Sequence, residues 1–528
     1  MGQEEFTTPI KISKFLGINN KSVSTEIDPK EAVDLRNVNI TDKSLAQRNG
    51  STYLSSNTFN NSVGNPAKMT GLHQFRLNGT DYYIGVGDDE IRLYNGTSWG
   101  SSIKGSITFT NDPNNLVSFA TFIDGDGDEV LVAGFRNEND APFKWKGASN
   151  VEALASTPGN FRFPVVHKNK LWVAVGDFLY YSGLLNCESW DVVNDLARFA
   201  GNSEDLSGIY KYSDKLIVFK PSSIFIISGS SNRDFVIADI ITDAGCASNE
   251  SIKEIQSRRY GNILAYVGRD GIIRGFNGSK TILNLGEYAS KTFDRMNESR
   301  YEYSSATVYN KLNQYIASYT DHSLKEHDNV IIYDFLNDTF SADNGRVLSS
   351  IFVHDNIFAN VQDTWIINNL EIWVTGDYEG NLLRQDNGLS DYETDTVHSY
   401  WWSSKLDFGV PENVKLLTDL NVGTVQTSTT SLYLSLSTEC QTADSDITIT
   451  AKGSLWGAMV WGVDTWGGNY DRRYTRAELT QSIPTDEGSM FGRWFSFKFD
   501  HNTASERMKI EEIVIGVSDL GQQAEYVE

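Results

Sequence analysis

The chain has 528 residues, with 12% aromatic residues, 43 glycines and only ten prolines. Its 69 acidic and 45 basic residues give a net charge of −24, which argues against a basic surface that grips nucleic acid. No apolar run approaches the roughly 20 residues of a membrane-spanning helix, so no membrane insertion is expected. Scarce helical periodicity and abundant aromatic residues favour an all-β protein of two or three domains.

The first 65 residues form an irregular N-terminal segment without a repeated pattern. Asp28 is placed to cap a short helix, with Pro29 at its first position and Glu31 at its third, so a helix is predicted through Leu35. The N-terminus has neither a basic region nor an apolar segment, so no signal peptide is expected.

Residues 72–99 read as three β-strands joined by two tight turns. Asn78-Gly79 is a strong hairpin signal, because a type I′ turn needs a positive φ at both central residues. Such an antiparallel unit cannot bury its own faces and therefore needs neighbours.

Looser copies of this unit recur as far as about residue 390. Their closing strands contain Tyr94, Trp145, Tyr180, Ile226, Arg274, Tyr333 and Leu383. The steps between these markers are 51, 35, 46, 48, 59 and 50 residues, a period typical of propeller blades of about four strands. We therefore predict a six- or seven-bladed β-propeller over residues 66–390, with an irregular β-sandwich array as the alternative.

Beyond a polar linker at residues 389–400, strictly alternating strands predict a C-terminal β-sandwich within residues 391–528. Three tryptophans, Trp456, Trp461 and Trp466, recur every five residues in a glycine-rich stretch. One interpretation is a loop whose rings staple the sandwich. The other is an exposed aromatic patch that docks another subunit.

The N-terminal segment resembles the signature of bacteriophage tail proteins of the nozzle, or packaged-DNA stabilisation, type found in short-tailed phages. The matching residues are Gly17, Ile18, Asn19, Pro29, Glu31, Ala32, Leu35, Asn37, Val38, Leu45, Arg48 and Gly50. Two positions depart from the pattern, since a Ser-Pro pair usually follows the Asn and an Arg-Pro-Gly is common where this chain has Arg48-Asn49-Gly50. Residues 171–191, 245–271 and the Trp-Gly repeats at 456–467 are also similar to that family.

Enzymatic motifs are missing from the sequence. No Ser-x-Asp-x-Gly-x-x-Trp turn of a sialidase, no Gly-x-Ser-x-Gly, no zinc spacing and no phosphate loop is present. Cys187, Cys246 and Cys440 are too widely spaced for a disulfide framework or a metal cluster, and read as free thiols made in a reducing cytoplasm. We therefore expect a non-enzyme without a cofactor or a metal.

Two acidic turns are candidates for the wall of a channel. They contain Asp88, Asp89 and Glu90, and Asp124, Asp126 and Asp128. The second turn imitates the start of a calcium loop, but Glu129 stands where that motif wants Gly and Phe135 where it wants Glu. An acidic hairpin turn is the preferred interpretation, and a bound cation is the alternative.

The resemblance implies a structural protein of the virion tail, made in the host cytoplasm. Its partners would be itself, as a closed ring such as a hexamer, and the neighbouring tail and portal-adaptor proteins. This nozzle would retain packaged DNA and conduct it on ejection without specific binding, past a like-charged wall. The alternative is a receptor- or carbohydrate-binding tail propeller, and a glycosidase is the third class considered.

Overall fold

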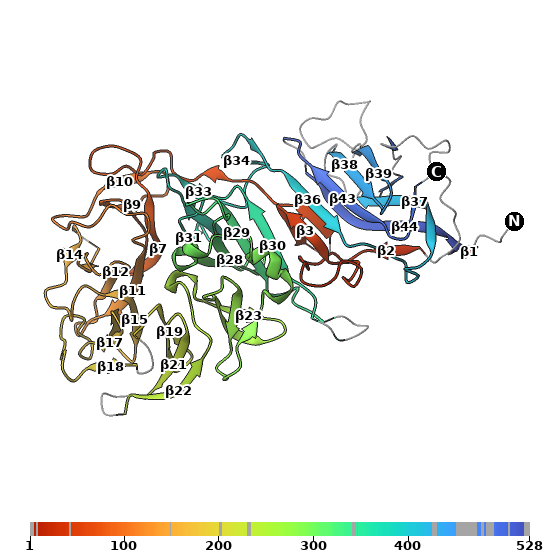
Figure 1. Ribbon diagram of the computed structural model, residues 1–528. Helices are drawn as coiled ribbons and strands as arrows, with labels where there is room; N and C mark the ends of the chain where they lie inside the picture. The colour runs from red at the N-terminus through yellow and green to blue at the C-terminus, as the bar shows by residue number, and fades with distance from the viewer. Residues whose placement is uncertain are drawn as a thin grey trace.

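The computed structural model shows a protein built almost entirely from β-strands (Figure 1). It describes residues 5–6, 9–41, 44–147, 149–199, 203–229, 234–340, 345, 347–424, 430–449, 473–476, 480–481, 490–504 and 507–521. The predicted fold class, a β-propeller with a β-sandwich, is confirmed, and the number of blades is seven.

Seven four-stranded antiparallel sheets form the blades. Blade 1 consists of β7 (Met69–Leu77), β8 (Thr80–Gly87), β9 (Glu90–Tyr94) and β10 (Trp99–Ser102). Blade 2 consists of β11 (Val117–Ile123), β12 (Glu129–Phe135), β13 (Phe143–Trp145) and β14 (Glu152–Ala153). Blade 3 consists of β15 (Arg162–His167), β16 (Lys170–Val175), β17 (Phe178–Tyr181) and β18 (Leu196–Arg198). Blade 4 consists of β19 (Gly208–Tyr212), β20 (Lys215–Phe219), β21 (Ser223–Ser228) and β22 (Val236–Thr242). Blade 5 consists of β23 (Lys253–Ser257), β24 (Gly261–Val267), β25 (Ile273–Phe276) and β26 (Leu283–Asn284). Blade 6 consists of β27 (Ala306–Tyr309), β28 (Gln314–Tyr319), β29 (Asn329–Asp334) and β30 (Ile351–Asp355).

Blade 7 closes the ring with a strand from the other end of the chain. Its strands are β31 (Val361–Ile367), β32 (Leu370–Gly376), β33 (Leu382–Arg384) and, outermost, β6 (Thr52–Tyr53). The first strands of neighbouring blades contact one another around most of the ring, including β31 with β7, so these strands surround the propeller axis. The seven marker residues of the sequence analysis all lie on the third strand of a blade.

The turn at Asn78-Gly79 has the geometry that the sequence predicts, with φ values of 47° and 81°. Both residues occupy the left-handed region, as a type I′ hairpin between β7 and β8 requires. Small helical turns connect some blades. They are η1 (Asn249–Ser251), η2 (Glu287–Ala289), α1 (Ser290–Phe293) and η3 (Glu298–Tyr303). None of the helices in the described part of the chain has both the length and the apolarity that crossing a bilayer requires.

Two further sheets pack face to face as the sandwich. The first contains β1 (Glu5–Phe6), β2 (Ile10–Ile12), β4 (Val38–Thr41), β5 (Ser44–Gln47), β37 (Val414–Thr424), β40 (Arg473–Arg476), β42 (Phe491–Gly492) and β44 (Lys509–Gly521). The second contains β3 (Ala32–Arg36), β36 (Ser399–Ser403), β38 (Thr430–Ser437), β39 (Thr442–Ile449), β41 (Thr480–Gln481) and β43 (Ser496–His501). A short hairpin of β34 (Ser390–Asp391) and β35 (Asp395–Thr396) precedes β36.

The helix predicted after Asp28 is wrong, because Ala32–Arg36 forms strand β3 and pairs with β36. Ala32 and Leu35 are fully buried in the sandwich core, and this long-range pairing overrides the local capping signal. Residues 1–65, set apart in the sequence analysis as a separate segment, supply strands to both sandwich sheets and to blade 7.

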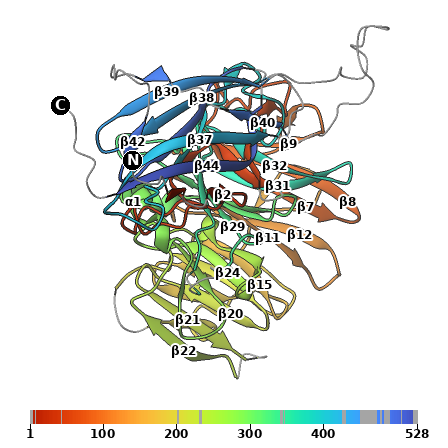
Figure 2. The same ribbon diagram turned by 90° about the vertical axis from the view of Figure 1, so that its right-hand side faces the viewer.

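One hydrophobic core runs from the sandwich into blades 5 and 6. It includes Trp401 and Phe15 of the sandwich side and Tyr315 and Phe352 of blade 6. Figures 1 and 2 show the sandwich, drawn in blue and red, against the green blades, while β22 lies at the far end of the propeller. The two domains therefore behave as one packed body.

Candidate functional site

The signature residues gather in one place, a buried seam between the sandwich and blade 6. The amide N–H groups of Gly17, Ile18 and Asn37 donate hydrogen bonds to the carbonyl oxygens of Ser349, Ile351 and Val353, at 2.8, 2.8 and 3.0 Å. The N-terminal segment thus runs along the outer edge of blade 6. All signature residues except Pro29, which is partly exposed, are buried.

Two glycines of the signature allow close backbone contact. A Cβ atom at Gly17 would lie 2.5 Å from the backbone nitrogen of Ile351, and one at Gly50 would lie 1.9 Å from the carbonyl oxygen of Ser390. Both distances are far below van der Waals contact, so only glycine fits at these positions without a shift of the backbone.

Glu31 is a fully buried carboxylate at the seam. It accepts one hydrogen bond from the side-chain amide of Asn19 and another from the backbone N–H of Ser349, both at 2.8 Å. A buried charge is tolerated only when it is hydrogen-bonded. These contacts join Asn19 and Glu31, two of the residues that carry the resemblance.

Arg48 uses all five of its N–H donors in the seam. It forms a two-pronged ion pair with Asp391 at 2.5 and 2.8 Å, and its Nε donates to Asn37 Oδ1 at 2.7 Å. The remaining donors reach the carbonyl oxygens of Asn49 at 3.0 Å and Asp355 at 3.1 Å. The Asn37 side-chain amide donates to the carbonyl oxygen of His398 at 2.7 Å and to the Asp355 carboxylate.

His354 lies beside this network and donates from Nε2 to the carbonyl oxygen of Val38 at 3.2 Å. Burial, together with the nearby Arg48 guanidinium, lowers the pKa of His354 to about 3. The imidazole is therefore neutral at physiological pH. The resemblance points to Arg48 but not to Asp355, Asp391 or His354, because these neighbours lie roughly 300 residues or more beyond Arg48 in the chain.

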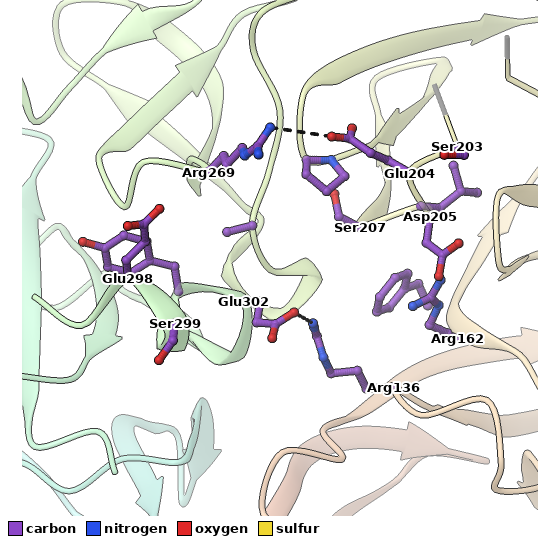
Figure 3. A pocket seen from close by; sticks show the side chains of 15 residues that line it. Arg136, Arg162, Ser203, Glu204, Asp205, Ser207, Arg269, Glu298, Ser299 and Glu302 are labelled. Atoms are coloured by element: carbon purple, nitrogen blue, oxygen red, sulfur yellow. Dashed lines mark hydrogen bonds and ion pairs between the residues drawn. The ribbon is translucent and has the colours of Figure 1, made fainter. Parts of the chain in front are cut away.

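A cavity of about 590 Å³ lies at one end of the propeller axis (Figure 3). Its walls are the connections between second and third strands and those between successive blades. Guanidinium groups line it in ion pairs: Arg136 with Glu302 at 2.8 Å, Arg162 with Asp205 at 3.3 Å, and Arg269 with Glu204 at 3.6 Å. No local motif in the sequence pointed to these arginines, because each comes from a different blade.

One set of contacts near this cavity reaches across the ring of blades. Arg136 follows β12 in blade 2, whereas Glu302 belongs to η3 between blades 5 and 6, so their ion pair joins blades that are not neighbours. The ring of Tyr303 lies 4.8 Å from the Arg136 guanidinium and 4.5 Å from that of Arg300. These cation–π contacts and the ion pair tie blade 2 to the connection between blades 5 and 6.

The acidic turn at residues 88–90 is tied to its own blade. The Lys104 ammonium group contacts Asp89 at 3.4 Å and Glu90 at 3.1 Å, and Asp88 accepts from the backbone N–H of Lys68 at 3.2 Å. Burial raises the pKa of the Asp88 carboxyl. Asp89 is also partly buried, but hydrogen bonds from Ser62 and the Lys104 ammonium outweigh that burial and lower its pKa.

Asp124, Asp126 and Asp128 lie in the hairpin between β11 and β12. The Asp124 carboxylate accepts from the N–H groups of Asp126 and Asp128 and pairs with Lys146 at 2.9 Å, a hydrogen bond that lowers its pKa. The described residues contain no group of three or more His, Cys, Asp or Glu side chains that could hold a metal ion. The two acidic turns lie at opposite ends of their blades, so the structure does not bring them together.

Trp456, Trp461 and Trp466, the candidate docking aromatics, lie outside the described residues. Of the three cysteines, Cys187 and Cys246 are buried free thiols and Cys440 is an exposed one. Burial raises the pKa of the Cys246 thiol to about 12, which makes it unreactive.

No protein-family model matches the chain, and no curated protein matches it. Among solved structures, BBS1N in complex with ARL6DN is similar over 66% of this chain and 99% of its own, with 11% identity and a TM-score of 0.37. BamB from Moraxella catarrhalis is similar over 73% and 98%, with 9% identity and a TM-score of 0.35. At such low values these similarities carry no argument about function. The blade topology itself defines the chain as a seven-bladed β-propeller protein joined to a β-sandwich.

Proposed function

We propose that this chain is a structural protein of a bacteriophage tail, one copy of a closed ring that forms the tail nozzle. In this role the ring retains packaged DNA and conducts it on ejection, without catalysis. The other partners are the neighbouring tail and portal-adaptor proteins, and the site of action is the virion tail. Closed rings of identical copies use heterologous contacts, in which two different surfaces of each copy meet.

The observation that carries the proposal is the convergence of the signature on the seam. Residues spread over positions 17–50 fix the outer edge of blade 6 to the sandwich through Glu31, Arg48 and the backbone of residues 17–18. The motif that resembles the nozzle family therefore corresponds to one structural device, a rigid joint between two domains. A rigid block suits a protein whose task is to hold shape within a wall.

The charge of the molecule also supports the proposal. A net charge of −24 disfavours contact with DNA phosphates, so a wall of this composition offers DNA few sites at which to stick. The alternative, a carbohydrate-binding propeller, favours exposed aromatic rings in a concave pocket. In the axial cavity the two aromatic rings, Phe163 and Tyr301, are only 2% and 6% exposed.

The experiment is to measure the copy number and position of this chain in virions. Gently released tails are weighed by mass photometry, and labelled chain is located by electron microscopy. We expect several copies in a closed ring around the path of the DNA. One copy per virion, or a position away from that path, would contradict the proposal. Clear turnover of a sialoside or polysaccharide panel by the purified chain would contradict its non-catalytic part.

A further inference from the structure

The sandwich presents a regular outer surface on the sheet of β3, β36, β43, β38 and β39. Alternation along these strands sends Trp401, Leu434 and Phe499 into the core. The residues between them project outward, and two of these are large exposed rings, with Trp402 42% and Tyr433 43% exposed. We call this surface the aromatic face; it consists of Asp34, Arg36, Tyr400, Trp402, Tyr433, Ser435, Lys498 and Asp500.

Strand register arranges the aromatic face in rows. Tyr400 pairs with Asp500, which pairs with Tyr433, so a carboxylate lies between two aromatic rings. Because neighbouring strands are about 4.8 Å apart, the backbones of the two tyrosines are about 10 Å apart. Trp402, two residues along β36 from Tyr400, is displaced by about 7 Å along the strand.

Hydrogen bonds hold two of these rings in place. The indole N–H of Trp402 donates a hydrogen bond to Ser496 Oγ on the neighbouring strand at 3.0 Å, and this bond orients the ring toward that strand. The Tyr400 hydroxyl donates to Asp34 Oδ2 at 3.0 Å, and the Lys498 ammonium lies 4.6 Å from the centre of the Tyr400 ring. Rings that are fixed before binding lose little entropy when a ligand stacks on them.

Four charged side chains of the aromatic face pair with one another. Arg36 lies 3.7 Å from Asp34, and Asp500 contacts both Lys498 and His398 at 2.8 Å. Strand register also places Asp444 of β39 beside Ser435 on the same side of the sheet, so aspartates outnumber arginine and lysine there and the surface repels a polyanion. The aromatic face presents a ligand with exposed aromatic rings next to hydrogen-bond donors and acceptors.

We propose that the aromatic face binds a short neutral oligosaccharide. The apolar faces of the sugar rings would stack on Trp402 and Tyr433, and the sugar hydroxyls would hydrogen-bond to Asp500, Lys498 and Ser435 between them. A nucleic acid needs a positive surface, and a peptide strand would add to a sheet edge rather than lie on a face. The proposal does not depend on the role of the chain in a tail.

The test is binding of the full-length chain to an array of neutral and acidic glycans, followed by calorimetry with the best neutral ligand. We expect saturable binding that Trp402→Ala and Tyr433→Ala each weaken at least about tenfold, as loss of an aromatic anchor does. Trp402→Phe, which keeps a ring, should retain part of the affinity. The matched control is Ile366→Ala, which removes a 55%-exposed side chain from the propeller and should change nothing.

Thermal melting curves of each variant verify that the fold is kept. Because Trp402→Ala and Tyr433→Ala are tested separately, the test still works if one of the two variants misfolds. The proposal is overturned if no neutral glycan binds up to millimolar concentration, or if only acidic glycans bind. It is also overturned if both alanine variants bind as the unmodified chain does, or if Ile366→Ala weakens binding equally.

Discussion

Arg48 is the residue on which the seam depends most. Its guanidinium is 3% exposed and the carboxylate of its partner Asp391 is 1% exposed, so the ion pair is screened from water. Removing one member of a buried pair leaves the other charge uncompensated, which costs about 3–5 kcal/mol. Lysine is a poor substitute, because it lacks the planar fork that reaches Asp391 with two N–H groups while also serving Asn37.

Substitution Arg48→Met should therefore lower the free energy of unfolding by about 3–5 kcal/mol, measured by urea denaturation at pH 7. The double variant Arg48→Met/Asp391→Leu should recover much of this loss, because no carboxylate is then left buried and unpaired. The exposed Arg76 supplies the control, since Arg76→Met should change the stability by less than about 0.5 kcal/mol. An equally small change for Arg48→Met would contradict this account of the seam.

His354 should make the molecule sensitive to mild acid. Its pKa is about 3 in the folded chain and about 6.5 in an unfolded one, so between these values the unfolded state binds the extra proton. Stability should thus fall with falling pH, by about 1.4 kcal/mol per pH unit below pH 6.5 from this residue. Asp334, whose pKa burial raises to about 6, acts in the opposite direction.

The comparison of His354→Gln with the unmodified chain isolates this contribution, because Asp334 is common to both. Urea denaturation at pH 7.0, 6.0 and 5.0 should show a shallower pH dependence for the variant. Parallel curves for the two proteins would mean that His354 takes up its proton while folded.

At the scale of elements, β6 is the strand that completes the propeller. The backbone N–H of Leu54 continues its pairing and donates to the carbonyl oxygen of Leu382 at 2.8 Å. Leu54→Pro removes this donor and should destabilise the chain by about 1–3 kcal/mol more than Leu54→Ala, which keeps it. The measurement is urea denaturation together with limited proteolysis, which should cut the proline variant between blades 7 and 1 first. Equal stabilities would show that closure does not depend on this strand.

The sequence was informative where structure is local. Asn78-Gly79 sets a hairpin by its own backbone preference, and the repeated third strands carry enough β-branched and aromatic residues to predict six or seven blades, of which the structure has seven. Ala32–Arg36 was mistaken for a helix because its partner, β36, lies hundreds of residues away. The axial cavity was missed for the same reason, since Arg136 and Glu302 meet only after the ring has closed.

At the scale of the whole molecule, the propeller is braced across its ring by the ion pair between Arg136, which follows β12 in blade 2, and Glu302, which lies between blades 5 and 6. Any passage wide enough for duplex DNA would therefore lie between copies of the chain in a ring and not through one propeller. In that arrangement each copy contributes one outer surface to the wall, and carboxylates are expected to outnumber lysine and arginine on it.

The net charge of −24 leads to a direct test on the free chain. Binding of fluorescent duplex DNA, followed by anisotropy at physiological salt, should be negligible, because the protein has few cations with which to release counterions from phosphate. Tight binding that weakens steeply with added salt would mean that the protein holds DNA, and the account of its charge would have to be dropped.

The pairing of the first strands with the last ones has a consequence for biosynthesis. Strands β2 and β5 pair with β44, and β6 pairs with β33, so the earliest residues leave the ribosome long before their partners exist. Blades 1 to 6 contain only local hairpins and can assemble during translation, whereas the sandwich must wait until β44 has been synthesised. Such long-range closure slows folding, and it exposes the apolar strands β2 and β5 to chaperones and to aggregation until β44 has emerged.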